Sequence, residues 1–180
     1  MFIFFCYHKL KYIYWRMKNM IIRKASASPE DIDILIQFRV DYFSHDMNLN
    51  KLSKHDEDAM RAQMPDYFRR HLGNDLTAFI AEIDGVPVGT AFMLVIEKPA
   101  NPVFLNGKTG MMLNVYTSAE YRLRGIATKV MEAVLEEAKR QELVYIELLA
   151  TPAGRKVYEK MGFFENIPEN GKTNMKIYIK

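Results

Sequence analysis

The 180-residue sequence has a single cysteine, Cys6, and no run of about 18 consecutive apolar residues. One cysteine forms neither an internal disulfide nor a cysteine zinc cluster, and such a chain suits a reducing cytoplasm. The four histidines show no metal-ligand spacing such as His-Glu-x-x-His. The sequence therefore predicts a cytoplasmic protein with no membrane-spanning helix and no metal.

An excess of basic charge is also lacking once the first twenty residues are set apart. Those residues hold four of the 25 Lys and Arg side chains and no Asp or Glu. Residues 21–180 therefore carry 21 basic and 22 acidic side chains, and the net charge of +3 comes from the N-terminal residues. Because most of the chain lacks the basic character of a nucleic-acid-binding protein, no nucleic-acid partner is expected.

Residues 1–19 form an atypical arm ahead of a domain that spans residues 20–180. The first twenty residues hold seven of the 22 aromatic side chains, with Lys and Arg between them. Aromatic and basic residues in this mixture suit a membrane surface or a protein partner. The alternative, which we favour, is that translation begins at Met17 or Met20 and that the arm is upstream sequence.

The rest of the chain alternates between helix and strand patterns. Ser28 before Pro29 is typical of a helix start, and Asp84-Gly85 is typical of a two-residue hairpin turn. The apolar residues within 125–141 recur with the period of an amphipathic helix. Strands are expected at 21–25, 77–83, 86–97, 109–117, 144–150 (a buried strand), from 163 onward and at 175–179, and helices at 28–43, 54–72 with a break or kink at Pro65, 125–141 and 152–161. This order predicts one mixed α/β domain.

The segment 113–128 carries the clearest chemical signal. A strand ends, and the turn Arg122-Leu123-Arg124-Gly125 opens the long helix. A helix N-terminus presents unpaired N–H groups and a partial positive charge to an anion, and Gly125 has no Cβ that would keep a phosphate away. Arg122 and Arg124 add positive charge, and Ala127 is small. The pattern indicates a pyrophosphate site, and the alternative is a basic turn whose glycine allows tight packing.

Two segments together resemble the GNAT superfamily of acyl-CoA N-acyltransferases. Arg122–Ala127 is similar to the family's Arg/Gln-x-x-Gly-x-Gly/Ala turn, and Val157–Phe163 is similar to its Leu-Tyr-Glu-Lys-Leu-Gly-Phe segment. The resemblance covers about residues 21–180 and is strongest over 113–163. The chain departs from the pattern at Ala119, where the family often has proline, and at Ala127, where glycine is commoner.

The resemblance implies a fold and a co-substrate. The fold would be α/β (α+β), a mixed, mostly antiparallel, twisted sheet of six to seven strands flanked by four helices. Acetyl-CoA would lie between the strands 109–117 and 144–150, with no metal. The implied cofactor-binding residues are Val115, Tyr116, Thr117, Arg122, Leu123, Arg124, Gly125, Ile126, Ala127 and Thr128.

The resemblance also implies catalytic groups. Tyr158 matches the family's tyrosine that protonates the departing thiolate, and the alternative is a packing aromatic. Glu147 interrupts an apolar strand and is either the general base or a solvated carboxylate. Asn114 would orient the substrate or bind water.

The implied reaction is transfer of an acetyl group from acetyl-CoA to a primary amine by direct attack. The acceptor would be a small molecule or a peptide, and residues 30–72 and 98–108 would line its site. One alternative is a non-catalytic acyl-CoA-binding or sensor module on the same fold. Another is an interaction module driven by residues 1–20. Homodimers are frequent in the family, but no feature of this sequence demonstrates one.

Overall fold

The computed structural model of the chain describes residues 19–45, 52–166 and 177. The chain divides into two compact units, Met1–Leu149 and Ala150–Lys180. The first unit contains β1 (Met20–Lys24), α2 (Pro29–His45), α3 (Lys54–His71), β2 (Leu76–Ile83), β3 (Val86–Glu97), β4 (Lys108–Thr117), the 3-10 helix η1 (Ala119–Tyr121), α4 (Ile126–Arg140) and β5 (Ile146–Glu147). The second unit contains α5 (Pro152–Lys160). This is the predicted order of elements from the first strand to the last helix.

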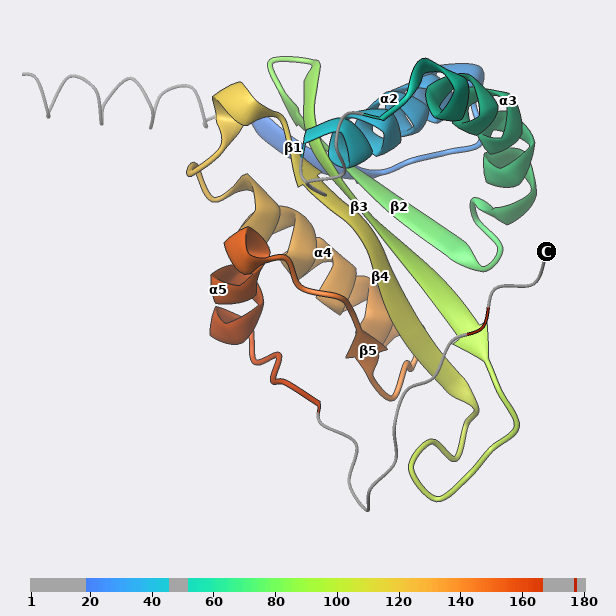
Figure 1. Ribbon diagram of the computed structural model, residues 1–180. Helices are drawn as coiled ribbons and strands as arrows, with labels where there is room; N and C mark the ends of the chain where they lie inside the picture. The colour runs from blue at the N-terminus through green and yellow to red at the C-terminus, as the bar shows by residue number, and fades with distance from the viewer. Residues whose placement is uncertain (1–18, 46–51, 167–176, 178–180) are drawn as a thin grey trace, which may run out of the picture. The chain divides into compact units, whose positions relative to one another are not determined.

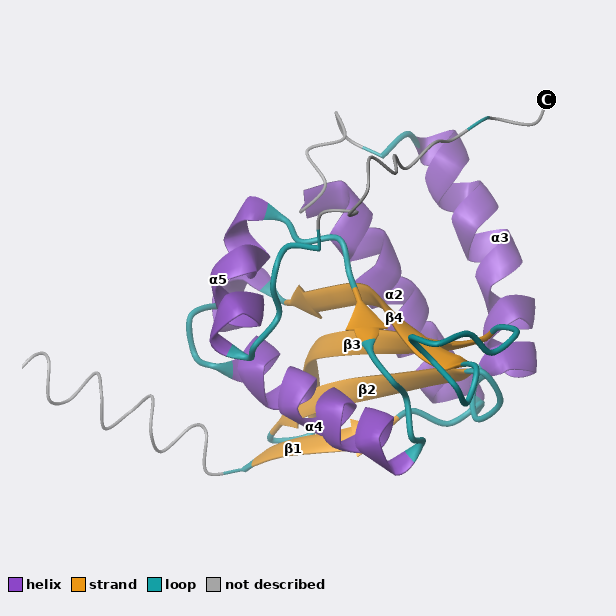
Figure 2. Ribbon diagram, turned by 90° about the horizontal axis from the view of Figure 1, so that it is seen from below, coloured by secondary structure: helices purple, strands orange, loops and turns teal. Residues whose placement is uncertain are grey.

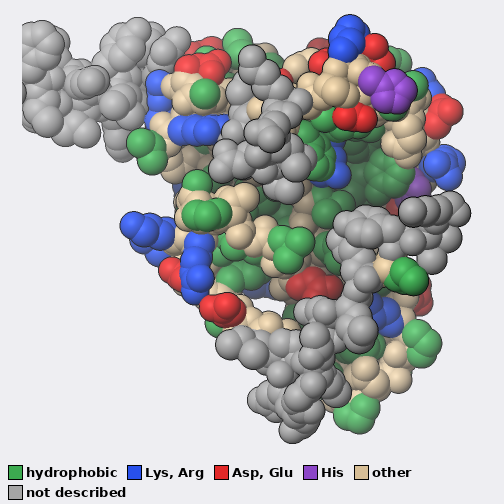
Figure 3. All heavy atoms as spheres, in the orientation of Figure 1, with side chains coloured by type: hydrophobic (Ala, Val, Ile, Leu, Met, Phe, Trp, Pro, Cys, Tyr) green, Lys and Arg blue, Asp and Glu red, His purple; other side chains and the backbone are tan. Residues whose placement is uncertain are grey.

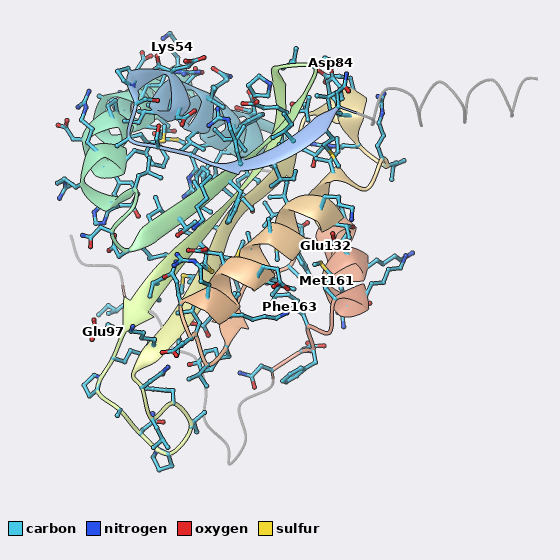
Figure 4. The ribbon with its side chains drawn as sticks, turned by 180° about the vertical axis from the view of Figure 1, so that it is seen from behind. Lys54, Asp84, Glu97, Glu132, Met161 and Phe163 are labelled. Carbon is cyan, nitrogen blue, oxygen red and sulfur yellow. The ribbon has the colours of Figure 1, made fainter. Side chains whose placement is uncertain are left out.

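The described strands form one five-stranded sheet in the order β1-β2-β3-β4-β5 (Figure 1). Neighbouring strands are antiparallel except β4 and β5, which are parallel. The φ angles are positive at both Asp84 (52°) and Gly85 (77°), as in a type I′ hairpin turn. Figure 4 shows Asp84 at this turn and Glu97 at the opposite end of β3. The predicted hairpin and the mixed, mostly antiparallel sheet are confirmed.

Helices cover both faces of the sheet (Figures 1 and 2). On one face, α2 and α3 pack against a core that includes Leu76, Ala78 and Ile80 of β2. On the other face, α4 contacts β1 to β4, and Gln141 just after it donates a hydrogen bond to Thr77 of β2. Side chains alternate between the two faces along a strand, so successive residues of β2 pack alternately against the α2–α3 layer and against the α4 layer.

The amphipathic pattern of α4 is confirmed by burial. Ile126, Val130, Met131 and Val134 are each no more than 1% exposed, so the predicted apolar stripe forms the core of its layer. None of the helices in the described ranges is long and apolar enough to cross a membrane.

The sequence predicts a break or a kink at Pro65. The helix α3 continues through Pro65, so the proline does not break it. Proline has no N–H for the carbonyl of Arg61, which costs the helix one hydrogen bond. The side chains of Met64 and Phe68, on either side of Pro65, are buried in the core shared with α2. Ser53 caps the helix by accepting a hydrogen bond from the Asp56 N–H. Packing and capping therefore outweigh the missing bond.

Two strand predictions are wrong. The apolar run 144–150 predicted a buried strand, but β5 has two residues, and Val144 and Leu149 are 45% and 97% exposed. Apolar composition cannot distinguish an edge strand from a central one. Residues 163–166, where another strand was expected to begin, form no strand. The described chain therefore has five strands rather than six to seven. The strand predicted at 175–179 and the arm 1–19 lie, apart from Ile177 and Asn19, outside the described residues.

The second unit is built around α5. Thr151 caps this helix by accepting a hydrogen bond from the Gly154 N–H, and Pro152 is its first residue, as the sequence predicts. Gly162 has a φ of 92°, the left-handed conformation of a glycine that ends a helix. Met161 and Phe163 stand on either side of this glycine (Figure 4).

Candidate active site

The strand β4 has an open edge in its second half. On the β5 side it pairs only through Gly110 and Met111, opposite Ile146 and Glu147. Beyond Met111, none of the described strands lies beside β4 on that side, and this stretch includes Val115, Tyr116 and Thr117. Backbone groups on this side of β4 point away from β3 and can pair with an extended ligand, as an added strand would.

A bulge bends β4 at the same place. The register with β3 shifts between Phe92, which pairs with Leu113, and Thr90, which pairs with Tyr116. Asn114 lies inside the bulge with a φ of 53°, a left-handed conformation that asparagine tolerates better than most residues. Its buried side chain accepts a hydrogen bond from Arg39 of α2 and donates one to the Phe38 carbonyl, both at 3.4 Å. Asn114 therefore ties the bulge to α2.

The turn between η1 and α4 is held by its own arginines. Arg122 Nε donates to the Thr117 carbonyl at 3.0 Å, and Arg124 Nη2 donates to the Glu120 carbonyl at 2.7 Å. Leu123 and Gly125 both have positive φ, 62° and 78°. A turn with such angles curls the backbone so that successive N–H groups converge, a geometry that binds anions.

The N-terminus of α4 opens directly from this turn. Its first helical hydrogen bond joins the Lys129 N–H to the Gly125 carbonyl, so the preceding N–H groups of residues 126–128 have no acceptor within the helix. Gly125 is the N-cap and supplies no side chain to cap them. A Cβ at Gly125 would meet no atom within 4 Å. Open space, free N–H groups and two arginines together favour a bound phosphate.

The end of β4 meets the start of α4 at a very close approach. A Cβ on Gly89 would lie 2.9 Å from the Tyr116 carbonyl oxygen and 3.3 Å from a methyl carbon of Ile126. The Thr117 hydroxyl lies in this contact, buried and without a hydrogen-bond partner among the described residues. Such a group is costly unless a ligand or water completes it. Gly89 thus allows the open edge of β4 and the turn before α4 to lie close together.

The two predicted catalytic residues have different surroundings. Glu147 is exposed on β5, beside Met111 of β4. Tyr158 belongs to the second unit, where its ring lies 5.8 Å from that of Phe163. Its ring also fills the space left by Gly154, since a Cβ there would lie 2.9 Å from Tyr158 Cε2. The structure brings all ten predicted cofactor-binding residues together in the first unit, with Glu147 in the same sheet.

A pocket of about 280 Å³ lies between α2, α3 and the sheet. Its lining includes Arg39, Gln63 and Tyr67 from the helices, together with Phe92 and Leu113 from the sheet beside the bulge. Burial lowers the pKa of Arg39 and raises that of Tyr67. At neutral pH the guanidinium remains charged and the phenol remains a hydrogen-bond donor. The pocket therefore combines the positive charge of Arg39 with apolar walls.

The family follows from a match that covers most of this architecture. The sequence model of the Acetyltransferase (GNAT) family matches residues 38–163, from α2 through the open edge of β4 to the end of the α5 segment. The chain belongs to the GNAT acetyltransferase family. The protein is therefore an acyltransferase, as the resemblance predicts. No curated protein matches the chain.

Solved structures agree with the GNAT assignment. A predicted acetyltransferase from Clostridium acetobutylicum, crystallised with acetyl-CoA, is 31% identical, with a TM-score of 0.70 over 86% of this chain and 96% of that chain. A GCN5-related N-acetyltransferase from Ralstonia eutropha is 22% identical, with a TM-score of 0.72 over 88% and 98%. Glucosamine-6-phosphate N-acetyltransferase from Arabidopsis thaliana is 19% identical, with a TM-score of 0.56 over 91% and 100%. The last two support the fold alone.

Sequence reasoning about this GNAT protein missed Arg39. A signal was present, because Arg39 follows Leu35 by four residues and Ile36 by three, which places it on the apolar face of α2. A charged residue at such a position is either paired or functional. Within the described residues, no group of three or more His, Cys, Asp or Glu side chains is arranged so that it could hold a metal ion.

Proposed function

We propose that this GNAT protein transfers an acetyl group from acetyl-CoA to the primary amine of a small acceptor by direct attack. One observation carries the proposal: the open edge of β4 runs directly into the anion-binding turn at the start of α4. An extended thioester arm with a pyrophosphate at one end suits that combination of backbone edge and helix N-terminus. The Clostridium acetobutylicum relative, crystallised with acetyl-CoA, supports the choice of ligand.

The ten predicted cofactor-binding residues would contact two different parts of acetyl-CoA. The N–H groups of residues 123–128, with Arg122 and Arg124, would hold the pyrophosphate. The backbone of residues 115–117 would pair with the amides of the pantetheine arm. The Thr117 hydroxyl, which no described residue hydrogen-bonds, would gain a partner from the ligand.

The chemical step joins the acceptor nitrogen to the acetyl carbon and breaks the carbon–sulfur bond. A backbone N–H on the open edge of β4 would stabilise the oxyanion of the tetrahedral intermediate. The amine must first lose a proton, because an alkyl amine has a pKa of about 10.4. Glu147, exposed on β5, would accept that proton and pass it to water. Tyr158 would donate its phenolic proton to the departing thiolate and regain one from solvent.

Calorimetric titration of acetyl-CoA into the protein tests the site. Gly125→Glu places a carboxylate where the pyrophosphate would lie and should weaken binding by more than about tenfold, because like charges repel. Gly73→Glu is the matched control, since Gly73 also has a positive φ (79°) and open space around its Cβ position. Gly73 lies beside the C-terminal end of α4, about 22 Å along that helix from Gly125 at its N-terminus.

The outcomes separate clearly. Weak binding by Gly125→Glu with normal binding by Gly73→Glu supports the site. Equal binding by both variants would place the pyrophosphate elsewhere, and no binding by the unaltered protein would refute the proposal. Release of free thiol with an amine present distinguishes an enzyme from a module that only binds acyl-CoA.

A further inference from the structure

The pocket between α2, α3 and β4 contains an arginine, Arg39, that forms no ion pair within the described part of the chain. Arg39 Nη1 lies 3.4 Å from Asn114 Oδ1, and its guanidinium stacks 4.6 Å from the ring of Phe43. Within the described residues, no carboxylate lies within 4.0 Å of it. Five other arginines form ion pairs, namely Arg23, Arg61, Arg69, Arg140 and Arg155. Arg70, Arg122 and Arg124 donate hydrogen bonds to backbone carbonyls.

The lone charge is costly in this setting. Arg39 is half-buried, and its polar contacts in the pocket are an amide oxygen and an aromatic face. Burying a cation without a counter-charge is unfavourable, and the penalty is reduced when an anion binds beside it. A guanidinium presents its donors as a planar fork that matches the two oxygens of a carboxylate or phosphate. Gln63 and Tyr67 line the same pocket and can donate further hydrogen bonds.

The pocket also borders the bulge of β4, next to residues 115–117, where the pantetheine arm of acetyl-CoA is proposed to pair. Leu113 lines the pocket and pairs with Phe92, another lining residue, at the start of the bulge. Asn114, the next residue, holds Arg39 by its side-chain oxygen. A ligand whose anion contacts Arg39 would therefore place its remaining atoms beside the bulge.

We infer that the acceptor is a small primary amine that also carries an oxyanion, a carboxylate or a phosphate, bound by Arg39, and an apolar segment that fills the pocket. This inference rests on the proposed function and narrows its substrate class. A volume of about 280 Å³ suits a molecule of amino-acid size. The charge of Arg39 disfavours polyamines and other multiply cationic acceptors. Charges of both signs lie on the outer surface of α2 and α3 in Figure 3, whereas none of the residues that line the pocket is acidic.

Matched pairs of acceptors test the inference by thiol release. The pairs are phenylalanine with phenylalaninamide, leucine with leucinamide, and phosphoethanolamine with ethanolamine, with spermidine as a cationic acceptor. The unaltered protein should prefer one of the anionic classes over its neutral partner by at least about tenfold in kcat/KM. Comparison of the amino-acid pairs with the phosphoethanolamine pair shows whether the protein recognises a carboxylate or a phosphate.

Arg39→Gln should remove that preference by raising KM for the anionic acceptor, while kcat changes less. Arg39→Lys retains the charge without the planar fork and should give an intermediate preference. Arg61→Gln on α3 is the control, because Arg61 pairs with Glu57 and does not line the pocket. Acetyl-CoA affinity, measured for each variant, should remain unchanged.

Three results would overturn the inference without touching the proposed acetyl-CoA site. The first is equal use of anionic and neutral acceptors, or faster use of spermidine. The second is a preference that survives Arg39→Gln. The third is that the protein binds acetyl-CoA, but Arg39 contributes neither to turnover nor to calorimetric binding of any anionic acceptor in the set. Loss of acetyl-CoA binding by the unaltered protein would instead refute the proposed function.

Discussion

The ion-pair cluster around Glu137 gives a prediction whose size can be worked from the structure. Glu137 lies on α4 with its side chain only 5% exposed, and its oxygens contact Lys24 of β1 at 2.6 Å as well as Arg140 and Gln141. The cluster joins α4 to the edge strand β1. Substitution Glu137→Gln keeps the shape of the side chain and removes its charge.

Hydrogen bonds from Arg140, with smaller contributions from Lys24 and Gln141, lower the pKa of Glu137 to about 2 although burial opposes the shift. From an ordinary value near 4.5, this corresponds to about 3 kcal/mol of unfolding free energy at neutral pH. Lys24 and Arg140 have side chains that are 48% and 66% exposed, so water screens part of this attraction. We expect Glu137→Gln to lose about 1–3 kcal/mol.

The pH dependence follows from the sign of the shift. The folded-state pKa lies below the unfolded one, so the stabilisation is complete above about pH 4.5 and disappears as the pH falls toward 2. The difference in unfolding free energy between the unaltered protein and Glu137→Gln should therefore fall to about half or less at pH 3.

Urea unfolding at pH 7 and pH 3 measures this difference. Glu136→Gln is the control, because Glu136 is 73% exposed and pairs with Lys139 at the surface, an interaction worth less than about 1 kcal/mol. An equal loss of stability for Glu137→Gln at both pH values would refute the electrostatic explanation. Acetyl-CoA affinity should be unaffected, since Glu137 lies near the opposite end of α4 from the proposed pyrophosphate site.

Three further substitutions test the site. Gly89→Ala should destabilise the protein by about 1–3 kcal/mol and weaken acetyl-CoA binding, because its Cβ would force the Tyr116 carbonyl away; urea unfolding and calorimetry would show both, and normal binding would contradict the close-approach argument. Thr117→Val should raise the unfolding free energy by about 1 kcal/mol yet weaken acetyl-CoA binding, since it removes a buried hydroxyl that has no partner among the described residues; tighter binding would count against a ligand contact. Tyr158→Phe should lower kcat about 10²-fold or more with little change in the KM for acetyl-CoA, and an unchanged kcat would remove Tyr158 as the acid.

Local signals in the sequence predicted local structure well. Asp84-Gly85 requires positive φ at two successive positions, and few other residue pairs adopt it, so the hairpin could be identified from two letters. The helix α4 was equally clear because its apolar residues keep a strict helical period. The predicted turn at residues 122–128 depends on the same kind of short-range information, and its role in binding stays a prediction.

Features that depend on distant residues were less accessible. The run 144–150 has the composition of a buried strand, but its exposure depends on its place at the sheet edge, which no local pattern encodes. The continuity of α3 through Pro65 depends on a core shared with α2 and β2. The pocket around Arg39 exists only because α2, α3 and the bulge of β4 meet, and its chemistry could not be derived from any one segment.

Amide hydrogen exchange with and without acetyl-CoA is the most direct test of the central claim. The N–H groups of residues 126–128 have no acceptor within α4 and should exchange quickly in the free protein. We predict that acetyl-CoA slows exchange at residues 115–117 and 123–128 together. Unchanged exchange at both segments in the presence of bound acetyl-CoA would contradict the account, because the ligand would then occupy another part of the protein.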